Sequence, residues 1–207
     1  MTIDELIRAV DLADTPAKMV AAVQNLAAVK DVAAIPSLIA VFGYNNPAAA
    51  SLAVAALTEL GEQAVPQLLN LDDYNYGARA YSIRTLAAIA DPRALDVLIT
   101  GAATDFAPSV RRAAAKGLGN LRYGKLPFHH RRKAWEKAWE TLLLVSLDSE
   151  WSIRYAAVVG LQALAKLPDL QEPIYTRLKE MLAMDTENVI RARVQLAVAN
   201  NNSHKTR

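Results

Sequence analysis

Residues 54–71 read VAALTELGEQAVPQLLNL, in which two apolar helical segments are joined by a short polar break. The same form returns at residues 23–42, VQNLAAVKDVAAIPSLIAVF, and at residues 83–102, IRTLAAIADPRALDVLITGA. A unit of this kind cannot bury its apolar face alone, so neighbouring units must stack on one another. The repetition therefore predicts an all-α protein, an α-solenoid of about five to six helical repeats with a concave surface.

The spacing of one leucine in the first helix of each unit defines the repeat. These leucines are Leu26, Leu57, Leu86, Leu118 and Leu161, with steps of 31, 29, 32 and 43 residues. The last step is about a dozen residues too long, which predicts an insertion near residues 122–134, where Gly124 and Pro127 interrupt the chain. We expect a single solenoid domain over residues 1–200, with a capping helix in residues 1–20 and a disordered tail in residues 201–207.

The composition restricts the classes of function. The 207 residues carry a formal net charge of +2, from 23 basic and 21 acidic side chains, so nucleic acid is not expected as a partner. The chain has no cysteine for a disulfide, a thiolate nucleophile or a metal site, which is consistent with a cytoplasmic location. The acidic N-terminus does not resemble a secretory signal, and no apolar run reaches the roughly 20 residues that cross a membrane. No Ser/His/Asp set, phosphate-binding loop or metal-ligand spacing is visible.

An arginine stands seven residues before the anchoring leucine in three units and aligns with a fourth in the last half-unit. These arginines are Arg79, Arg111, Arg154 and Arg191, and we call them the arginine column. The first two units have Met19 and Ala50 at this position. Because an arginine can pair with an acid from an adjacent turn, a structural role is favoured for the column. The candidate acids are Asp72 or Asp73 for Arg79, Asp105 for Arg111, Asp148 for Arg154 and Asp185 for Arg191.

The recurrence of Arg, paired small residues and Leu, as in SVRRAAAKGLGNL and SIRYAAVVGLQAL, resembles the HEAT-like repeat of the phycobilin lyases, D-x-x-V-R-x-A-A-x-x-L-[GA]-x-[LI]. Residues 72–99, 104–123 and 148–167 are similar to the F-type subunits of heterodimeric E/F phycocyanobilin lyases. The resemblance implies an enzyme subunit, active only with an E-type partner, that attaches phycocyanobilin to a cysteine of the phycocyanin α-subunit through a thioether bond. The bilin is then a substrate and not a prosthetic group. A related pair that also isomerises the bilin uses a motif with a cysteine, which this chain lacks, so isomerisation is disfavoured.

The implied chemistry requires three kinds of side chain. An arginine fork suits the bilin propionates, a carboxylate can hydrogen-bond the pyrrole N–H groups and favour the protonated chromophore, and aromatic faces can stack on conjugated rings. All three kinds cluster at the turns that lead into first helices, which stacked units would bring onto one edge. The predicted catalytic carboxylates are Asp105, Asp148 and Glu150. The predicted bilin-binding residues are Tyr74, Tyr76, Tyr81, Arg84, Arg112, Trp151 and Tyr155, and no metal site is predicted.

Other interpretations remain open at this point. A noncatalytic HEAT-like adaptor could bind phycobiliproteins during phycobilisome assembly or degradation in cyanobacteria, and a generic protein-binding solenoid would show the same repeats. Tyr81 and Tyr155 suit helix packing as well as stacking, and the basic run at residues 129–133, HHRRK, suits either a solvated face or an acidic partner. The sequence does not tell which subunit carries the proton donor or whether the two subunits share the bilin site.

Overall fold

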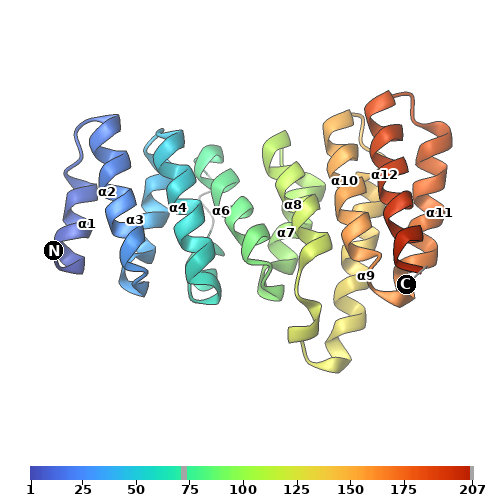
Figure 1. Ribbon diagram of the computed structural model, residues 1–207, viewed down its shortest axis with the longest axis horizontal. Coiled ribbons are helices and arrows are strands. Elements are labelled where there is room, and N and C mark those ends of the chain that lie inside the picture. The colour runs from blue at the N-terminus through green and yellow to red at the C-terminus, as the bar shows by residue number, and fades with distance from the viewer. Residues whose placement is uncertain (71–73, 206–207) are drawn as a thin grey trace. The chain divides into compact units, whose positions relative to one another are not determined.

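The computed structural model describes residues 1–70 and 74–205, with side chains described as far as residue 199. These residues form helices and the turns between them, with no β-strand in the described part of the chain, which confirms the all-α class (Figure 1). The chain divides into two compact units, Met1–Ala94 and Leu95–Arg207. A single solenoid domain over residues 1–200 stays a prediction.

The N-terminal unit consists of helices in two layers. Its α-helices are α1 Ile3–Asp11, α2 Pro16–Val29, α3 Ile35–Ala40, α4 Pro47–Leu60, α5 Val65–Leu68 and α6 Tyr76–Ile89. Short 3-10 turns lie between them: η1 Val32–Ala34, η2 Val41–Gly43, η3 Gly61–Gln63 and η4 Pro92–Ala94. In one layer α2 packs on α4 and α4 on α6, while α1, α3 and α5 each pack against the helix that follows them (Figure 1). Each such helix pair buries its apolar face by stacking on the next pair, as the repeat predicts.

Local sequence explains where these helices begin. Thr2 forms a capping box with Glu5, and the Thr15 hydroxyl accepts a hydrogen bond from the Lys18 backbone N–H at 3.2 Å. This second cap starts α2 at Pro16, so residues 1–20, where one capping helix is predicted, hold α1 and the beginning of α2. Prolines open the second helices of the first two repeats, since Pro36 and Pro66 lie in the first turns of α3 and α5, where the missing N–H costs nothing.

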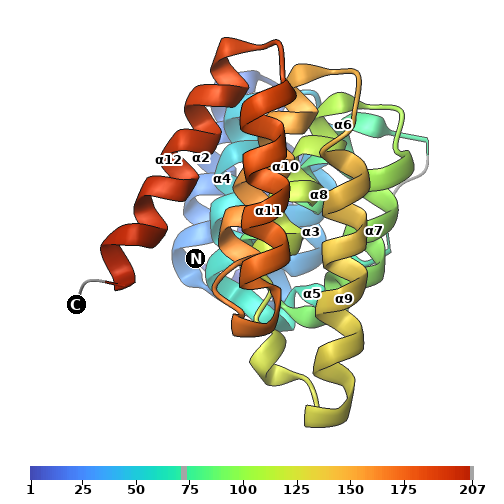
Figure 2. The ribbon, with the colours of Figure 1, turned by 90° about the vertical axis from the view of Figure 1, so that its right-hand side faces the viewer.

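The C-terminal unit repeats the two-layer arrangement, with longer helices in the layer of α7, α9 and α11. They are α7 Leu95–Thr104, α8 Pro108–Asn120, α9 Phe128–Val145, α10 Trp151–Leu164, α11 Pro168–Met184 and α12 Asn188–Lys205, with the 3-10 turn η5 Tyr123–Lys125 before α9. Helices α8 and α12 both pack on α10, and α7 packs on α8 and on α9. Figure 2 shows this unit from the side, with α12 at one edge and α7 and α9 at the other. Residues 201–205, predicted as part of a disordered tail, form the end of α12, and residues 206 and 207 lie outside the described residues.

The core of both units is built on the anchoring leucines. Leu26, Leu57, Leu86, Leu118 and Leu161 are all 0% exposed, which confirms the register inferred from their spacing. The predicted insertion near residues 122–134 holds η5 and the first turns of α9. Arg131 closes it by donating to the carbonyl oxygens of Leu126 and Gly124 at 2.8 and 2.6 Å. Within the described residues, no helix is long and apolar enough to span a bilayer.

Candidate functional site

The turns of the C-terminal unit are closed by aspartates at equivalent positions. A carboxylate oxygen of Asp105 accepts the Ala107 N–H at 2.8 Å, Asp148 accepts the Glu150 N–H at 2.9 Å, and Asp185 accepts the Glu187 N–H at 3.0 Å. Each of these bonds spans two residues and fixes the chain just before an even-numbered helix. Two of the three carboxylates predicted to be catalytic, Asp105 and Asp148, therefore have a structural task in their own turns.

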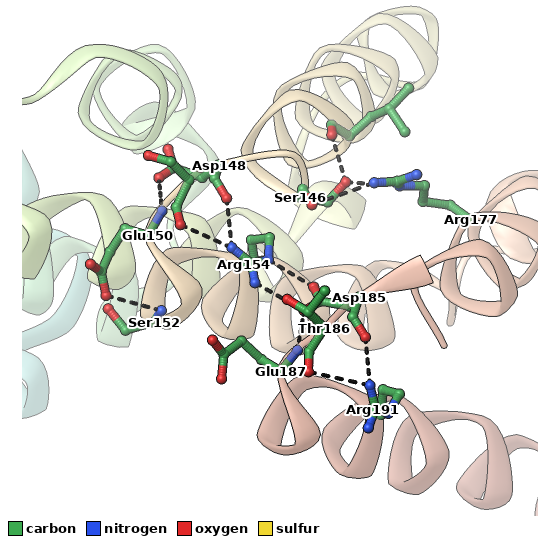
Figure 3. A network of polar contacts seen from close by, with 12 residues as sticks. Ser146, Asp148, Glu150, Ser152, Arg154, Arg177, Asp185, Thr186, Glu187 and Arg191 are labelled. Carbon is green, nitrogen blue, oxygen red and sulfur yellow. Dashed lines mark hydrogen bonds and ion pairs between the residues drawn. The ribbon is translucent and has the colours of Figure 1, made fainter. Parts of the chain in front are cut away.

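The arginine column ties successive turns together (Figure 3). Arg111 forms an ion pair with Asp148, and Arg154 donates to both oxygens of Asp185 at 2.7 and 2.9 Å. In each case the acid belongs to the following turn. Arg154 also donates to the backbone oxygens of Asp148 and Ser149, in its own turn, at 2.9 and 3.1 Å. A structural role of the column is thus confirmed for Arg111 and Arg154, but the predicted partners are wrong, because each arginine pairs with the aspartate of the following turn and not with Asp105 or Asp148 of its own turn.

The two ends of the column differ from its middle. Arg191 donates to the backbone oxygens of Asp185 and Thr186 at 2.8 and 3.3 Å and to the side chain of Asn188. Arg79 is a buried side chain of α6, only 8% exposed. Asp72 and Asp73, its candidate partners, lie outside the described residues, so their pairing with Arg79 stays a prediction.

Electrostatics supports the structural role of the second ion pair. The hydrogen bond from Arg154 lowers the pKa of Asp185 below its usual value of 3.8, although burial opposes this. The same hydrogen bond raises the pKa of Arg154. Since the side chains are only 15% and 6% exposed, both charges depend on each other for solvation. Asp185 is therefore held as a carboxylate and is unsuited to give up a proton in a reaction.

Glu150 is the most accessible of the three predicted carboxylates. One of its oxygens accepts the Ser152 N–H at 3.3 Å and so caps α10, while the residue as a whole is exposed. The neighbouring Trp151, the first residue of α10, is 46% exposed. Among the residues that the structure describes, no three His, Asp or Glu side chains gather as a metal ion would require. The chemistry available at this turn is that of an acid beside an aromatic ring.

One face of α10 collects polar side chains from its two neighbours. From α8, Arg112 donates to the Ser152 hydroxyl at 3.0 Å. From α12, the Arg193 guanidinium lies over the Tyr155 ring, 5.9 Å from its centre, and also donates to the side chain of Gln162. We call these five residues the α10 face. Arg112 and Tyr155 are predicted site residues, and the structure brings them to the same helix.

Arg193 is a residue that the sequence analysis missed. It stands two positions after Arg191, within the repeat pattern but outside the arginine column, so no recurring motif marks it. The signal that could have found it is its equivalence to Tyr81, which stands two positions after Arg79. Both positions depart from the small residues, Ala113 and Ala156, that the other two units have there.

In the N-terminal unit, two of the predicted tyrosines line one pocket. Tyr76 and Tyr81 border a cavity of about 230 Å³, together with Phe42 and Asn45. The rings of Phe42 and Tyr81 are stacked with their centres 5.4 Å apart. Tyr81 thus packs against a core aromatic residue and also borders the cavity, while its stacking on a bilin stays a prediction. No sequence pattern identifies Phe42 as a site residue, because it only stands at the end of a helical segment.

The remaining predicted residues of this unit lie outside the pocket. Tyr74 precedes α6 and is fully exposed, at 101% of its reference area. Arg84 lies two turns into α6 and is also exposed. The predicted bilin-binding set therefore falls into two groups, with Tyr74, Tyr76, Tyr81 and Arg84 in the N-terminal unit and Arg112, Trp151 and Tyr155 in the C-terminal unit.

Comparison with known proteins identifies the class of this fold. A family model of HEAT repeats matches residues 65–128. The phycocyanobilin lyase subunit beta of Nostoc sp. is 72% identical over 195 residues, which are 94% of this chain and 98% of the relative. The phycocyanin alpha phycocyanobilin lyase CpcF of Synechocystis sp. is 44% identical over 200 residues, which are 96% of this chain and 94% of that relative.

A solved structure agrees with these relatives. In the complex of CpcE and CpcF of phycocyanin lyase from Nostoc sp., one chain is 74% identical to this one and superposes with a TM-score of 0.79, over 81% of this chain and 99% of that chain. The protein is thus a HEAT-repeat protein. More narrowly, it belongs to the CpcF family, the beta subunits of phycocyanobilin lyase, which confirms the resemblance inferred from the repeats.

Proposed function

We propose that this chain, together with an E-type subunit, attaches phycocyanobilin to a cysteine of the phycocyanin α-subunit through a thioether bond. The observation that carries the proposal is the close relative from Nostoc sp., 74% identical, which was solved in a complex with CpcE. The similar protein from Synechocystis sp. is named for phycocyanin alpha and phycocyanobilin. The relatives come from cyanobacteria, and we place the reaction in the cytosol of such a cell.

The reaction is an addition and needs no oxidant or reductant. The acceptor cysteine gives up its thiol proton and its sulfur bonds to the exocyclic carbon of the bilin's ethylidene group. The double bond is consumed, and the carbon at its other end, in the tetrapyrrole ring, takes up one proton. The acceptor protein supplies the thiol, so a lyase subunit without cysteine is sufficient. The enzyme has to hold the bilin in one conformation, supply a proton and exclude other nucleophiles.

We assign these tasks to the residues according to their surroundings. Glu150 is the carboxylate best placed to exchange a proton, because it is exposed and is not in an ion pair within the described residues. Asp105 and Asp148 support the site by closing its turns. In the C-terminal unit, Trp151 and Tyr155 on α10 supply ring contacts to the bilin, and Arg112 supplies a further contact from a half-buried position. The N-terminal unit, taken by itself, offers Tyr76 and Tyr81 at its pocket and Tyr74 and Arg84 at exposed positions as candidate bilin contacts.

Reconstitution tests the proposal. The chain is mixed with its E-type partner, phycocyanobilin and the apo-phycocyanin α-subunit, and a covalent, fluorescent product is measured. We expect product with both subunits present and little with either alone. Absence of product with both subunits, combined with tight binding to finished phycocyanin, would favour a noncatalytic adaptor. Full activity of the isolated chain would contradict the need for a partner.

Variants test the residue assignments in the same assay. We expect Tyr81→Ala, Trp151→Ala and Glu150→Gln each to lower the rate of transfer roughly tenfold or more, because each removes a contact or a proton donor at the reacting substrate. Leu12→Ala, at an exposed position after α1, serves as a control of similar kind. Circular dichroism melting checks that each variant folds. If all three site variants fold and transfer at the normal rate, the assigned surfaces are wrong.

A further inference from the structure

Arg193 is a cation without a carboxylate partner. Its guanidinium contacts only neutral groups among the described residues, namely the Gln162 side chain and the Tyr155 ring. Its Nη1 atom is buried and has no hydrogen-bond acceptor among those residues. A buried charged donor that is left without an acceptor is costly, because its hydration is lost and nothing replaces it. The position therefore favours a ligand that brings an acceptor, and a negatively charged one above all.

Arg112 is a second cation of the same kind. Its Nη1 donates to the Ser152 hydroxyl at 3.0 Å, a neutral partner, and no carboxylate in the described part of the chain pairs with it. Two arginines of the column behave differently, since Arg154 has both its Nε and Nη2 on the Asp185 carboxylate and Arg111 pairs with Asp148. Arginines of the C-terminal unit thus occur both with an aspartate partner, in the middle of the column, and without one, on the α10 face.

The two cations reach the same stripe of one helix. Ser152 and Tyr155 are three residues apart on α10, so their side chains lie on one face. Helices α8 and α12 pack on the two sides of α10, and each contributes one arginine to this stripe (Figure 1). The Tyr155 ring is a part of this stripe and presents an aromatic surface beside the guanidinium of Arg193.

We propose that Arg112 and Arg193 bind the two propionate groups of the bilin, one carboxylate each, with Tyr155 beside the conjugated plane. An arginine fork can pair bidentately with a carboxylate. Because Nη1 of Arg193 is closed to solvent, the half-buried side chain must turn its guanidinium toward the ligand to form such a pair. The ligand class that satisfies the α10 face is a dicarboxylate with a flat conjugated body. This inference rests on the proposed function, because it specifies which part of that substrate the C-terminal unit holds.

Esterification of the ligand provides the test. The complex with the E-type partner is assayed for transfer to the apo-α-subunit with phycocyanobilin and with its dimethyl ester, whose propionates carry no charge. We expect the wild-type complex to prefer the free acid roughly tenfold or more in kcat/KM. Arg193→Gln and Arg112→Gln should each reduce this preference, mainly by raising KM for the free acid, and should leave the ester nearly unaffected. Arg193→Lys, which keeps the charge but loses the fork, should fall between the two.

A matched control separates a local effect from loss of positive charge. Arg132→Gln removes an arginine on α9 whose side chain is 80% exposed, and we expect it to keep the preference for the free acid. If the wild-type complex transfers neither substrate, the proposed function fails. If it transfers the free acid and the Arg193 and Arg112 variants retain the preference, or lose activity for acid and ester alike, the inference is overturned while the proposed function stands. Arg112 is half-buried, so its variant keeps the test valid should Arg193→Gln not fold.

Discussion

The first two repeats of the N-terminal unit and the repeats of the C-terminal unit fill the same register with opposite kinds of side chain. In those first two repeats, Met19 and Ala50 are buried at 9% and 1% exposure, while the third repeat of the N-terminal unit has Arg79 there. In the C-terminal unit, Arg111 and Arg154 occupy that register, each paired with an aspartate of the following turn. An apolar side chain fills this position without further requirements, whereas an arginine needs an acid and backbone oxygens to offset its desolvation. The repeat therefore tolerates an apolar residue or an arginine at this position, and the arginine requires a suitable acid and backbone oxygens nearby.

Close helix packing is a second difference between the units, and breaking it should have the largest effect. A Cβ atom added at Gly119 of α8 would lie 2.1 Å from the backbone oxygen of Gly160 in α10. Buried alanines line α4 of the N-terminal unit instead. We expect Gly119→Ala to lower the free energy of unfolding by about 3 kcal/mol or more, since two backbones must separate. Urea denaturation measures the loss.

Gly124 provides the control for this substitution. A Cβ atom at Gly124 would meet nothing within 4 Å. We expect Gly124→Ala to change the free energy of unfolding by less than about 0.5 kcal/mol. Equal losses for the two variants would mean that the approach of α8 to α10 does not limit the stability of the C-terminal unit.

The second prediction asks whether apolar side chains can replace the ion pair between Arg154 and Asp185. Arg154→Met places at α10 the residue that α2 has at this register, and it leaves the Asp185 carboxylate, 6% exposed, without its partner. We expect a loss of about 2 kcal/mol in the free energy of unfolding, from an unpaired buried charge. The double variant Arg154→Met/Asp185→Leu removes both charges and should regain most of the loss. A double variant less stable than the single one would show that the ion pair is not replaceable.

The fold could be predicted from the sequence because the same buried leucine recurs in each repeat. Leu57 and Leu161 are separated by units of different length, yet both are fully buried, since each faces a core that only stacking can form. The arginine column was visible for the same reason. The identity of each partner was less accessible, because Arg111 pairs with Asp148, 37 residues later, and the step between turns varies with the insertion.

The candidate site was predictable only in part. Tyr81 attracted attention because the repeat does not require a tyrosine there, and it lines a pocket. Its neighbour Phe42 comes from a different repeat, and a stacked pair of rings across repeats leaves no pattern along the chain. Arg193 escaped detection because an arginine on a polar helix face is common, and what distinguishes it is a buried nitrogen without an acceptor. Such a property belongs to three-dimensional packing and not to spacing.

The smallest expected effect is the loss of stability from the Arg154–Asp185 ion pair in acid. The pKa of Asp185 is lowered in the folded protein by the hydrogen bond from Arg154, so the folded state favours the ionised form more than the unfolded state does. The stabilisation is therefore fully present above the usual pKa of 3.8 and is lost as the pH falls through the lower folded pKa. Asp185→Asn should be less stable than wild type at neutral pH, and the difference should shrink as the pH falls below that value. Asp14→Asn, which removes the acid of an exposed ion pair with Lys18, is the matched control. Free energies of unfolding measured from pH 7 down to about pH 3 check the trend, and a constant difference between Asp185→Asn and wild type would contradict it.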